Sequence, residues 1–350
     1  MKKIFFFFLF IIAVSCGNPS SGTHQKMEAK GGKVYGGTLK INETDKYVSL
    51  YPPSIVDVVS MDIASQMYEG LVRFDASNIV HVLPAIADSW EVDATGTVYT
   101  FKLKKGVKFH DDACFSDGKG REVKSSDFKY SFQLICTANE DNQFFKSSFK
   151  GKVKGADAYY ENSKSGKPGD LEGVKVIDDY TLQLTLTSPA SSFLYILAGP
   201  AGYVMPKEAI EKYGNKSVVG TGPFKMGSMD ADKVILVRNP FYYRTDSLGN
   251  QLPFLDSVVV SFILDNTQEL DAFKKGDIHM IFGLPSAEVS KMVEAQIADF
   301  KSKTPKYILS RTSEMTTQYY QFNVVRPPFN NVKVRQAFSY AVDRDKIISD

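Results

Sequence analysis

Two hydrophobic periods recur along this chain, and together they predict a mixed α/β fold. Apolar residues occupy every second position in residues 181–187, Thr-Leu-Gln-Leu-Thr-Leu-Thr, which is the period of a half-buried strand. In residues 62–72 they recur at steps of four, which predicts an amphipathic helix capped by Ser60 or Asp62. The same patterns predict strands at residues 36–41, 97–103, 234–237 and 258–263, a helix capped by residues 125–127, and helices at residues 267–274 and 332–341. Polar residues 162–170 are the strongest candidate for an internal linker.

The first residues are arranged like a secretory signal. Two lysines precede an unbroken apolar run over residues 4–14, which is too short to span a bilayer as a helix but suits the apolar part of a signal peptide. Ala-Val-Ser-Cys follows and ends at Cys16. This resembles a bacterial lipobox, in which the cysteine is acylated by diacylglycerol and the signal is cut before it. We therefore expect a lipid-anchored protein in the cell envelope, on the periplasm-facing or exterior side of a membrane. The alternative is an ordinary signal that is cut elsewhere.

Composition and charge narrow the class of protein. The 350 residues include 42 Lys+Arg and 40 Asp+Glu, with 43% hydrophobic and 23% charged residues. These values exclude a disordered chain, a collagen-like fibre and a polytopic membrane protein. A nucleic-acid partner is not expected, because such proteins normally carry a basic excess.

The chain carries no familiar catalytic motif. It has no P-loop, no G-x-S-x-G, no H-E-x-x-H and no C-x-x-C. The acidic stretch His110-Asp111-Asp112 lacks the ligand spacing of a calcium loop, so a surface turn is the better interpretation than a metal site. Cys114 and Cys136 either form a disulfide or remain two buried thiols, and both alternatives stay open. We expect no catalytic residues, no metal and no cofactor, which favours a binding protein over an enzyme.

Several segments together resemble one family. The chain is similar to the bacterial extracellular solute-binding proteins of family 5, which carry oligopeptides, dipeptides or nickel to ABC importers. The similarity rests on GGTL (36–39), YEGLV (68–72), LPAIADSWEV (83–92), YTFKLKKGVKFHD (99–111), GTGPF (220–224), RNPFY (238–242), GDI (276–278), PPFNNVKVRQA (327–337) and VDR (342–344). Each segment alone is weak evidence, but their order along residues 36–350 is specific.

The resemblance implies the two-lobed α/β fold of periplasmic binding proteins, in the class with an extra third domain. Family members are usually longer, so the second lobe is expected to be incomplete in this chain. The implied domains are a signal peptide at 1–15, a tether at 16–35, lobe I at 36–58 and 173–265, the extra domain II at 59–172, and the start of lobe II at 266–350.

The resemblance also implies a function. The protein is expected to capture peptides between its two lobes and to deliver them, as a monomer, to the permease subunits of an ABC importer in the membrane. A nickel or metallophore binder is the alternative within the family. A secreted peptidase and a structural surface lipoprotein are the alternatives from other classes.

Three groups of residues match family segments that line the cleft between the lobes. They are Val58 with Ser60, Phe144 with Phe145, and Thr221 with Gly222. The turn at 220–222 is the best supported, because Gly222 lets backbone approach a ligand and Thr221 offers a hydroxyl. A structural hinge turn without ligand contact is the open alternative.

Overall fold

The computed structural model describes residues 27–282 and 319–349, together with residues 288, 291, 307, 308 and 310. The chain divides into two compact units, residues 1–285 and 286–350. The predicted signal peptide and Cys16 lie outside the described residues. Within the described residues, no helix combines the length and the apolar content that crossing a membrane requires.

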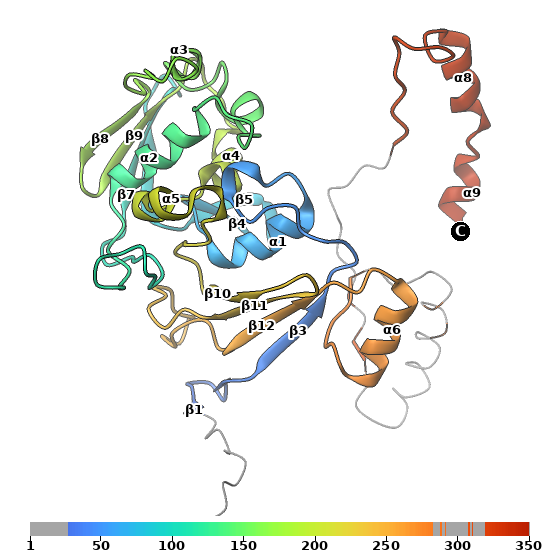
Figure 1. The fold of residues 1–350 in the computed structure, drawn as a ribbon, viewed down its shortest axis with the longest axis horizontal. Coiled ribbons are helices and arrows are strands. Elements are labelled where there is room, and N and C mark those ends of the chain that lie inside the picture. The colour runs from blue at the N-terminus through green and yellow to red at the C-terminus, as the bar shows by residue number, and fades with distance from the viewer. Residues whose placement is uncertain are drawn as a thin grey trace, which may run out of the picture. The chain divides into compact units, whose positions relative to one another are not determined.

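A four-stranded sheet and one helix build the first core of the first unit. The strands β3 (Thr38–Asn42), β10 (Phe224–Met229), β11 (Lys233–Arg238) and β12 (Ser257–Ser261) lie in the order β10-β11-β12-β3. All pairs are antiparallel except β12 with β3, which run parallel. The helix α1 (Val58–Met67) lies beside this sheet (Figure 1). Alternating residues such as Val234 and Leu236 are buried with Ile63 of the helix, because strand side chains alternate between faces.

A second four-stranded sheet builds the other core of this unit. The antiparallel strands β6 (Ala87–Val92), β7 (Val98–Leu103), β9 (Thr181–Thr185) and β8 (Val174–Asp178) lie in that order. The helix α2 (Ser125–Ile135) contacts β8 and β9 (Figure 1). Its Phe128 and Phe132 are fully buried with Phe101 and Leu182 of the sheet. The hairpin of β4 (Val72–Asp75) and β5 (Asn78–Pro84) adds to this core through Val72.

The remaining elements of the first unit are short. They are β1 (Met27–Glu28), β2 (Val34–Tyr35), α3 (Ala156–Ser163), α4 (Phe193–Ala198), α5 (Lys207–Tyr213), α6 (Asn266–Lys275), the π-helical turn η2 (Phe145–Phe149), and the 3-10 turns η1 (Pro52–Ser54), η3 (Pro200–Gly202) and η4 (Gly214–Lys216).

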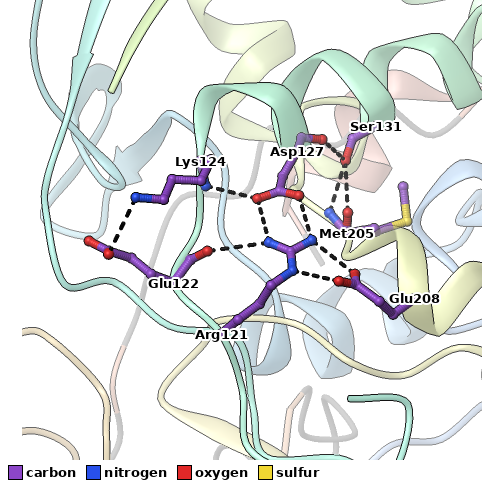
Figure 2. Close-up of polar contacts among 7 residues, drawn as sticks. All are labelled: Arg121, Glu122, Lys124, Asp127, Ser131, Met205 and Glu208. Atoms are coloured by element: carbon purple, nitrogen blue, oxygen red, sulfur yellow. Dashed lines mark hydrogen bonds and ion pairs between the residues drawn. The ribbon is translucent and has the colours of Figure 1, made fainter. Parts of the chain in front are cut away.

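An ion-paired network ties α2 to α5. The guanidinium of Arg121 donates two hydrogen bonds to the carboxylate of Asp127, at 2.9 and 2.8 Å, and two to that of Glu208, at 2.6 and 2.9 Å (Figure 2). The Asp127 carboxylate also accepts from the backbone N–H of Lys124, the residue before the helix. Glu208 lies in the first turn of α5. One arginine therefore fixes the starts of two helices.

The second unit contains α8 (Val332–Ala341) and α9 (Arg344–Ser349). The side chain of Asn331 caps α8 by accepting a hydrogen bond from the Lys333 N–H at 2.9 Å. Phe322, Phe329 and Phe338 form a cluster of rings with centroids 4.8 to 5.6 Å apart. No residue of α8 is buried.

The first predicted helix differs from α1 at both ends. It begins at Val58, because the Asp57 side chain, rather than Ser60 or Asp62, accepts a hydrogen bond from a first-turn N–H. It ends at Met67, where Tyr68 takes an extended conformation with φ −118° and ψ 154°. Leu71 therefore packs in the other core.

Contacts in the first unit cross two predicted domain boundaries and the predicted linker. The strand β9 pairs with both β7 and β8, so residues 174–185 share one sheet with strands of the predicted extra domain. Residues 162–170 are not a linker between domains, because α3 before them and β8 after them contribute to one core. Residues 276–280, after the predicted start of lobe II at residue 266, contact β3 through His279 N–H donating to Lys40 O at 2.7 Å.

The two cysteines are not bonded to each other. Cys136 is buried and Cys114 is half-buried, and both are free thiols. Of the two alternatives that the sequence left open, the structure therefore contains thiols.

Candidate ligand-binding site

The start of α1 presents one exposed and one buried residue of the predicted site. Val58 is 65% exposed, whereas Ser60 is fully buried. The Ser60 hydroxyl accepts hydrogen bonds from the N–H groups of Val48 and Ser49, at 2.9 and 3.1 Å. Its side chain therefore holds the preceding loop against the helix.

The two predicted phenylalanines lie in different surroundings. Phe145 is buried, and its ring stacks on Tyr160 with a centroid distance of 3.9 Å. Phe144 is half-buried and packs against both cores of the first unit. The N–H of Gln143 donates to Pro53 O at 2.9 Å, which places this segment beside the loop before α1.

The turn at 220–222 is buried against the end of α1. The Gly222 N–H donates to Met67 O at 2.8 Å, and Gly222 O accepts from Asn239 Nδ2 at 2.9 Å and contacts His110 Nε2 at 3.0 Å. A Cβ on Gly222 would lie 2.4 Å from Gln66 O. The close approach that glycine permits here is an approach to α1.

A buried neutral histidine holds this turn in place. The Gly220 N–H donates to His110 Nδ1 at 3.3 Å, so Nε2 is the protonated nitrogen and donates to Gly222 O. Burial lowers the pKa of His110 from 6.5 to about 4, which keeps the ring neutral. The Thr221 hydroxyl is buried and has no hydrogen-bond partner among the described residues. These contacts give the turn a structural role, and ligand contact at Thr221 and Gly222 stays a prediction.

A groove lies between α1 and the first sheet, and none of the six predicted residues lines it. Its volume is about 330 Å³. Its lining combines one sheet face, part of α1 and the segment after α6: Leu39, Ile41, Glu43, Asp62, Ile63, Ser65, Gln66, Leu236, Val258, Val260, Met280 and Phe282. The alternation of apolar residues in residues 36–41 and 258–263 was the available signal, but it does not reveal which sheet face stays open.

Two carboxyl groups, of Glu43 and Asp62, line this otherwise largely apolar groove. Burial raises the pKa of Glu43 to about 7, and the negative charges of Asp62 and Glu269 add to that rise. Burial also raises the pKa of Asp62. Within residues 27–282, neither Glu43 nor Asp62 forms an ion pair with a lysine or arginine. The groove is therefore suited to an aliphatic group that carries a hydrogen-bond donor or a positive charge.

Comparisons with known proteins agree with the fold. A family model described as "Bacterial extracellular solute-binding proteins, family 5 Middle" matches residues 81–350, well over half of the chain. The chain is 30% identical over 319 residues to the periplasmic oligopeptide-binding protein OppA of Escherichia coli. The aligned region covers 89% of this chain and 54% of that relative. The chain thus spans about half the length of the curated relatives it matches.

Solved structures give the same result. The periplasmic oligopeptide-binding protein OppAIV of Borrelia burgdorferi superposes with a TM-score of 0.72 and 25% identity, covering 89% of this chain and 58% of that one. The periplasmic binding protein DppA of Helicobacter pylori, solved in complex with the peptide STSA, superposes with a TM-score of 0.62 and 26% identity, covering 74% of this chain and 49% of that one. The predicted fold class is confirmed.

Proposed function

The chain belongs to the bacterial extracellular solute-binding proteins of family 5, and on this basis we propose that it takes part in capturing peptides for an ABC importer. Peptides would be held between two lobes and delivered to the permease subunits in the membrane. The observation that carries the proposal is the family match over residues 81–350. The relatives named for oligopeptide binding and for a bound peptide support peptides as the solute.

The surfaces around α1 suggest which residues would meet a peptide through their side chains. Val58 and the open side of Phe144 are the two predicted positions that are not fully packed. Ser60, Phe145, Thr221 and Gly222 would act by shaping the backbone beside them. In peptide recognition, roomy and hydrated pockets accept varied side chains while backbone hydrogen bonds supply affinity.

Binding and turnover can be measured on the same samples. Isothermal titration calorimetry with pools of short peptides should show saturable binding, and mass spectrometry of the recovered pools should show them intact. A Val58→Asp variant should weaken binding, whereas Val176→Asp, at an exposed position on β8, should not. Binding that neither variant changes would count against the site.

The alternatives give different results in the same experiment. Binding of a nickel chelate without binding of peptides would favour a metallophore binder. Hydrolysed peptides would favour a secreted peptidase, and no binding of any solute would favour a structural lipoprotein. In the described part of the chain, no group of three or more His, Cys, Asp or Glu side chains is arranged to hold a metal.

We further propose that Cys16 carries a lipid that holds the protein at the cell envelope. The apolar run that ends in Ala-Val-Ser-Cys supports this proposal. Intact-mass analysis of membrane-extracted protein should show a lipidated Cys16, and a Cys16→Ala variant should leave the membrane fraction. A variant that stays as firmly bound as the wild type would contradict it.

We also propose that the protein is a monomer. Light scattering of the purified protein should give the mass of a monomer.

A further inference from the structure

The chain passes from one core of the first unit to the other at Glu69. Met67 and Tyr68 are buried in the core of the first sheet, whereas Leu71 and Val72 are buried in the core of the second. Glu69 lies between them and is only 8% exposed. A carboxyl is seldom buried to this extent without an ion-pair partner, so its surroundings need a specific explanation.

The Glu69 carboxyl joins this crossing to a segment that follows β11. Its Oε1 accepts hydrogen bonds from the hydroxyls of Tyr242 and Tyr243, at 2.8 and 3.3 Å. Its backbone carbonyl accepts from the N–H of Val204 at 3.0 Å. The other carboxyl oxygen, Oε2, is buried and has no hydrogen-bond partner among the described residues. Three separate parts of the chain therefore meet at one residue.

Four further titratable groups from neighbouring elements act on this carboxyl. They are Arg73 on β4, Lys104 after β7, Tyr203 before α5 and Arg244 after the two tyrosines. Lys104 Nζ donates to Ala85 O and Ala87 O at 2.7 Å and lies 3.7 Å from Asp88. Arg244 donates to the Tyr242 hydroxyl at 3.4 Å. None of these cations forms a hydrogen bond with Glu69 in the described structure.

We propose that Glu69 is a pH-sensitive fastening between the two cores: its neutral carboxyl keeps the Tyr242–Tyr243 segment attached, and its ionisation loosens that attachment. A buried carboxylate with one oxygen unbonded is costly, because nothing replaces the water that this oxygen binds when exposed. Water entering beside Tyr243 relieves that cost. Arg73 Nε is also buried without a partner, so water admitted there finds a donor as well as an acceptor.

The pH range follows from the burial of the group. Burial raises the pKa of Glu69 from 4.5 to about 7, against the smaller lowering effect of the tyrosine hydrogen bonds and the arginines. The carboxyl of the unfolded chain ionises near its ordinary pKa of 4.5. The stability that the neutral carboxyl contributes is thus full below about pH 4.5 and is lost as the pH rises to about 7.

Carbon-13 NMR of the full chain labelled at the glutamate carboxyls tests this directly. A Glu69→Gln variant identifies the resonance by its loss, and Glu43→Gln removes the other glutamate whose pKa is raised to about 7. We expect the Glu69 resonance to titrate near pH 7. A midpoint below about pH 5.5, close to an ordinary glutamate, would overturn the proposal.

Hydrogen exchange tests the loosening itself. After correction for the intrinsic pH dependence, peptides covering residues 203–205 and 239–244 should exchange at least about tenfold faster at about pH 8.5 than at about pH 6. The increase should be absent in Glu69→Gln and present in Glu91→Gln, at an exposed position on β6. An equal increase in Glu69→Gln would overturn the proposal.

Tyr243→Phe keeps the test decisive if Glu69→Gln does not fold. This change retains the ring and removes one donor to the carboxyl, so the Glu69 midpoint should move to higher pH. An unmoved midpoint would show that the Tyr243 hydroxyl does not bond the Glu69 carboxyl, and the proposal would be rejected.

Discussion

At the residue scale, the glycines of the turn at 220–222 let its backbone approach the backbone of α1 closely. A Cβ on Gly220 or Gly222 would lie 2.1 or 2.4 Å from a carbonyl oxygen of α1. Both glycines are required by the neighbouring helix, since their own backbone conformations do not demand glycine. The sequence identified the turn but gave no sign that the close neighbour was Met67.

Gly222→Ala should therefore destabilise the protein by about 2 kcal/mol or more, because the overlap is with backbone that has no room to move. Gly199→Ala is a matched control, because its φ is −98° and the nearest atom to its added Cβ is 3.8 Å away. The control should stay within about 0.5 kcal/mol of the wild type in urea unfolding. Equal losses in the two variants would refute the packing argument.

Thr221→Val separates a structural role from ligand contact. The buried Thr221 hydroxyl has no partner in the described structure, so replacing it with a methyl group should raise the unfolding free energy by about 1 kcal/mol. If the hydroxyl also bonds a peptide, calorimetry should show an affinity loss of about 1 kcal/mol in the same variant. A loss of stability would contradict the structural part of this prediction.

At the element scale, the positions of α2 and α5 depend on one guanidinium. Arg121 bonds two carboxylates with paired hydrogen bonds, and its guanidinium also lies 5.2 Å from the centroid of the Phe109 ring. Asp127 is almost fully buried, whereas Glu208 is about one third exposed. Removing the Arg121 guanidinium would leave the buried Asp127 carboxylate without its cation.

Arg121→Lys should cost about 2 kcal/mol, because a lysine supplies one point charge where the arginine supplies paired donors to each carboxylate. A double-mutant cycle with Glu208→Gln isolates the contribution of one pair. The exposed pair of Lys207 and Glu211, 3.3 Å apart, is the control and should contribute about 0.5 kcal/mol or less. An Arg121 effect no larger than this control would argue against the network as a tie between helices.

Local signals predicted the elements whose ends are set by nearby residues. The helix at 332–341 was predicted at the bounds of α8, where the side chain of Asn331 caps the first turn. The start of α1 was misplaced because Asp57, Ser60 and Asp62 are all acceptable caps, and only contacts with the preceding loop select among them. Pairing between distant strands, such as β7 with β9, has no local signal, so the sequence could not show that strands on either side of residue 172 share one sheet.

At the scale of the whole molecule, the same limitation applies to the groove. Its floor joins Leu39 on β3 to Val258 on β12, which lie at opposite ends of the first unit's sequence and pair in register. Each strand was predicted from its own alternation. The open face, and the carboxyl groups of Glu43 and Asp62 that line it, result from assembly of the sheet with α1.

The boundary between the units also belongs to this scale, and two positions for it compete. The resemblance places the second lobe from residue 266, whereas the contacts place residues 266–285 with the first unit. Leu270 and Ile278 are each only 4% exposed, and Asn42 Nδ2 donates to Glu269 at 3.0 Å. A boundary at 266 would separate Glu269 from its hydrogen-bond partner Asn42 on β3.

Two shortened chains distinguish these positions. A chain ending at residue 285 should keep a cooperative unfolding transition in circular dichroism, because both cores of the first unit lie before that point. A chain ending at residue 265 should lose about 3 kcal/mol or more, since it exposes the surface that Leu270 and Ile278 cover and leaves the Asn42 amide without its carboxylate. If the two chains unfold at the same urea concentration, residues 266–285 contribute nothing to the first unit, and the second lobe begins where the resemblance places it.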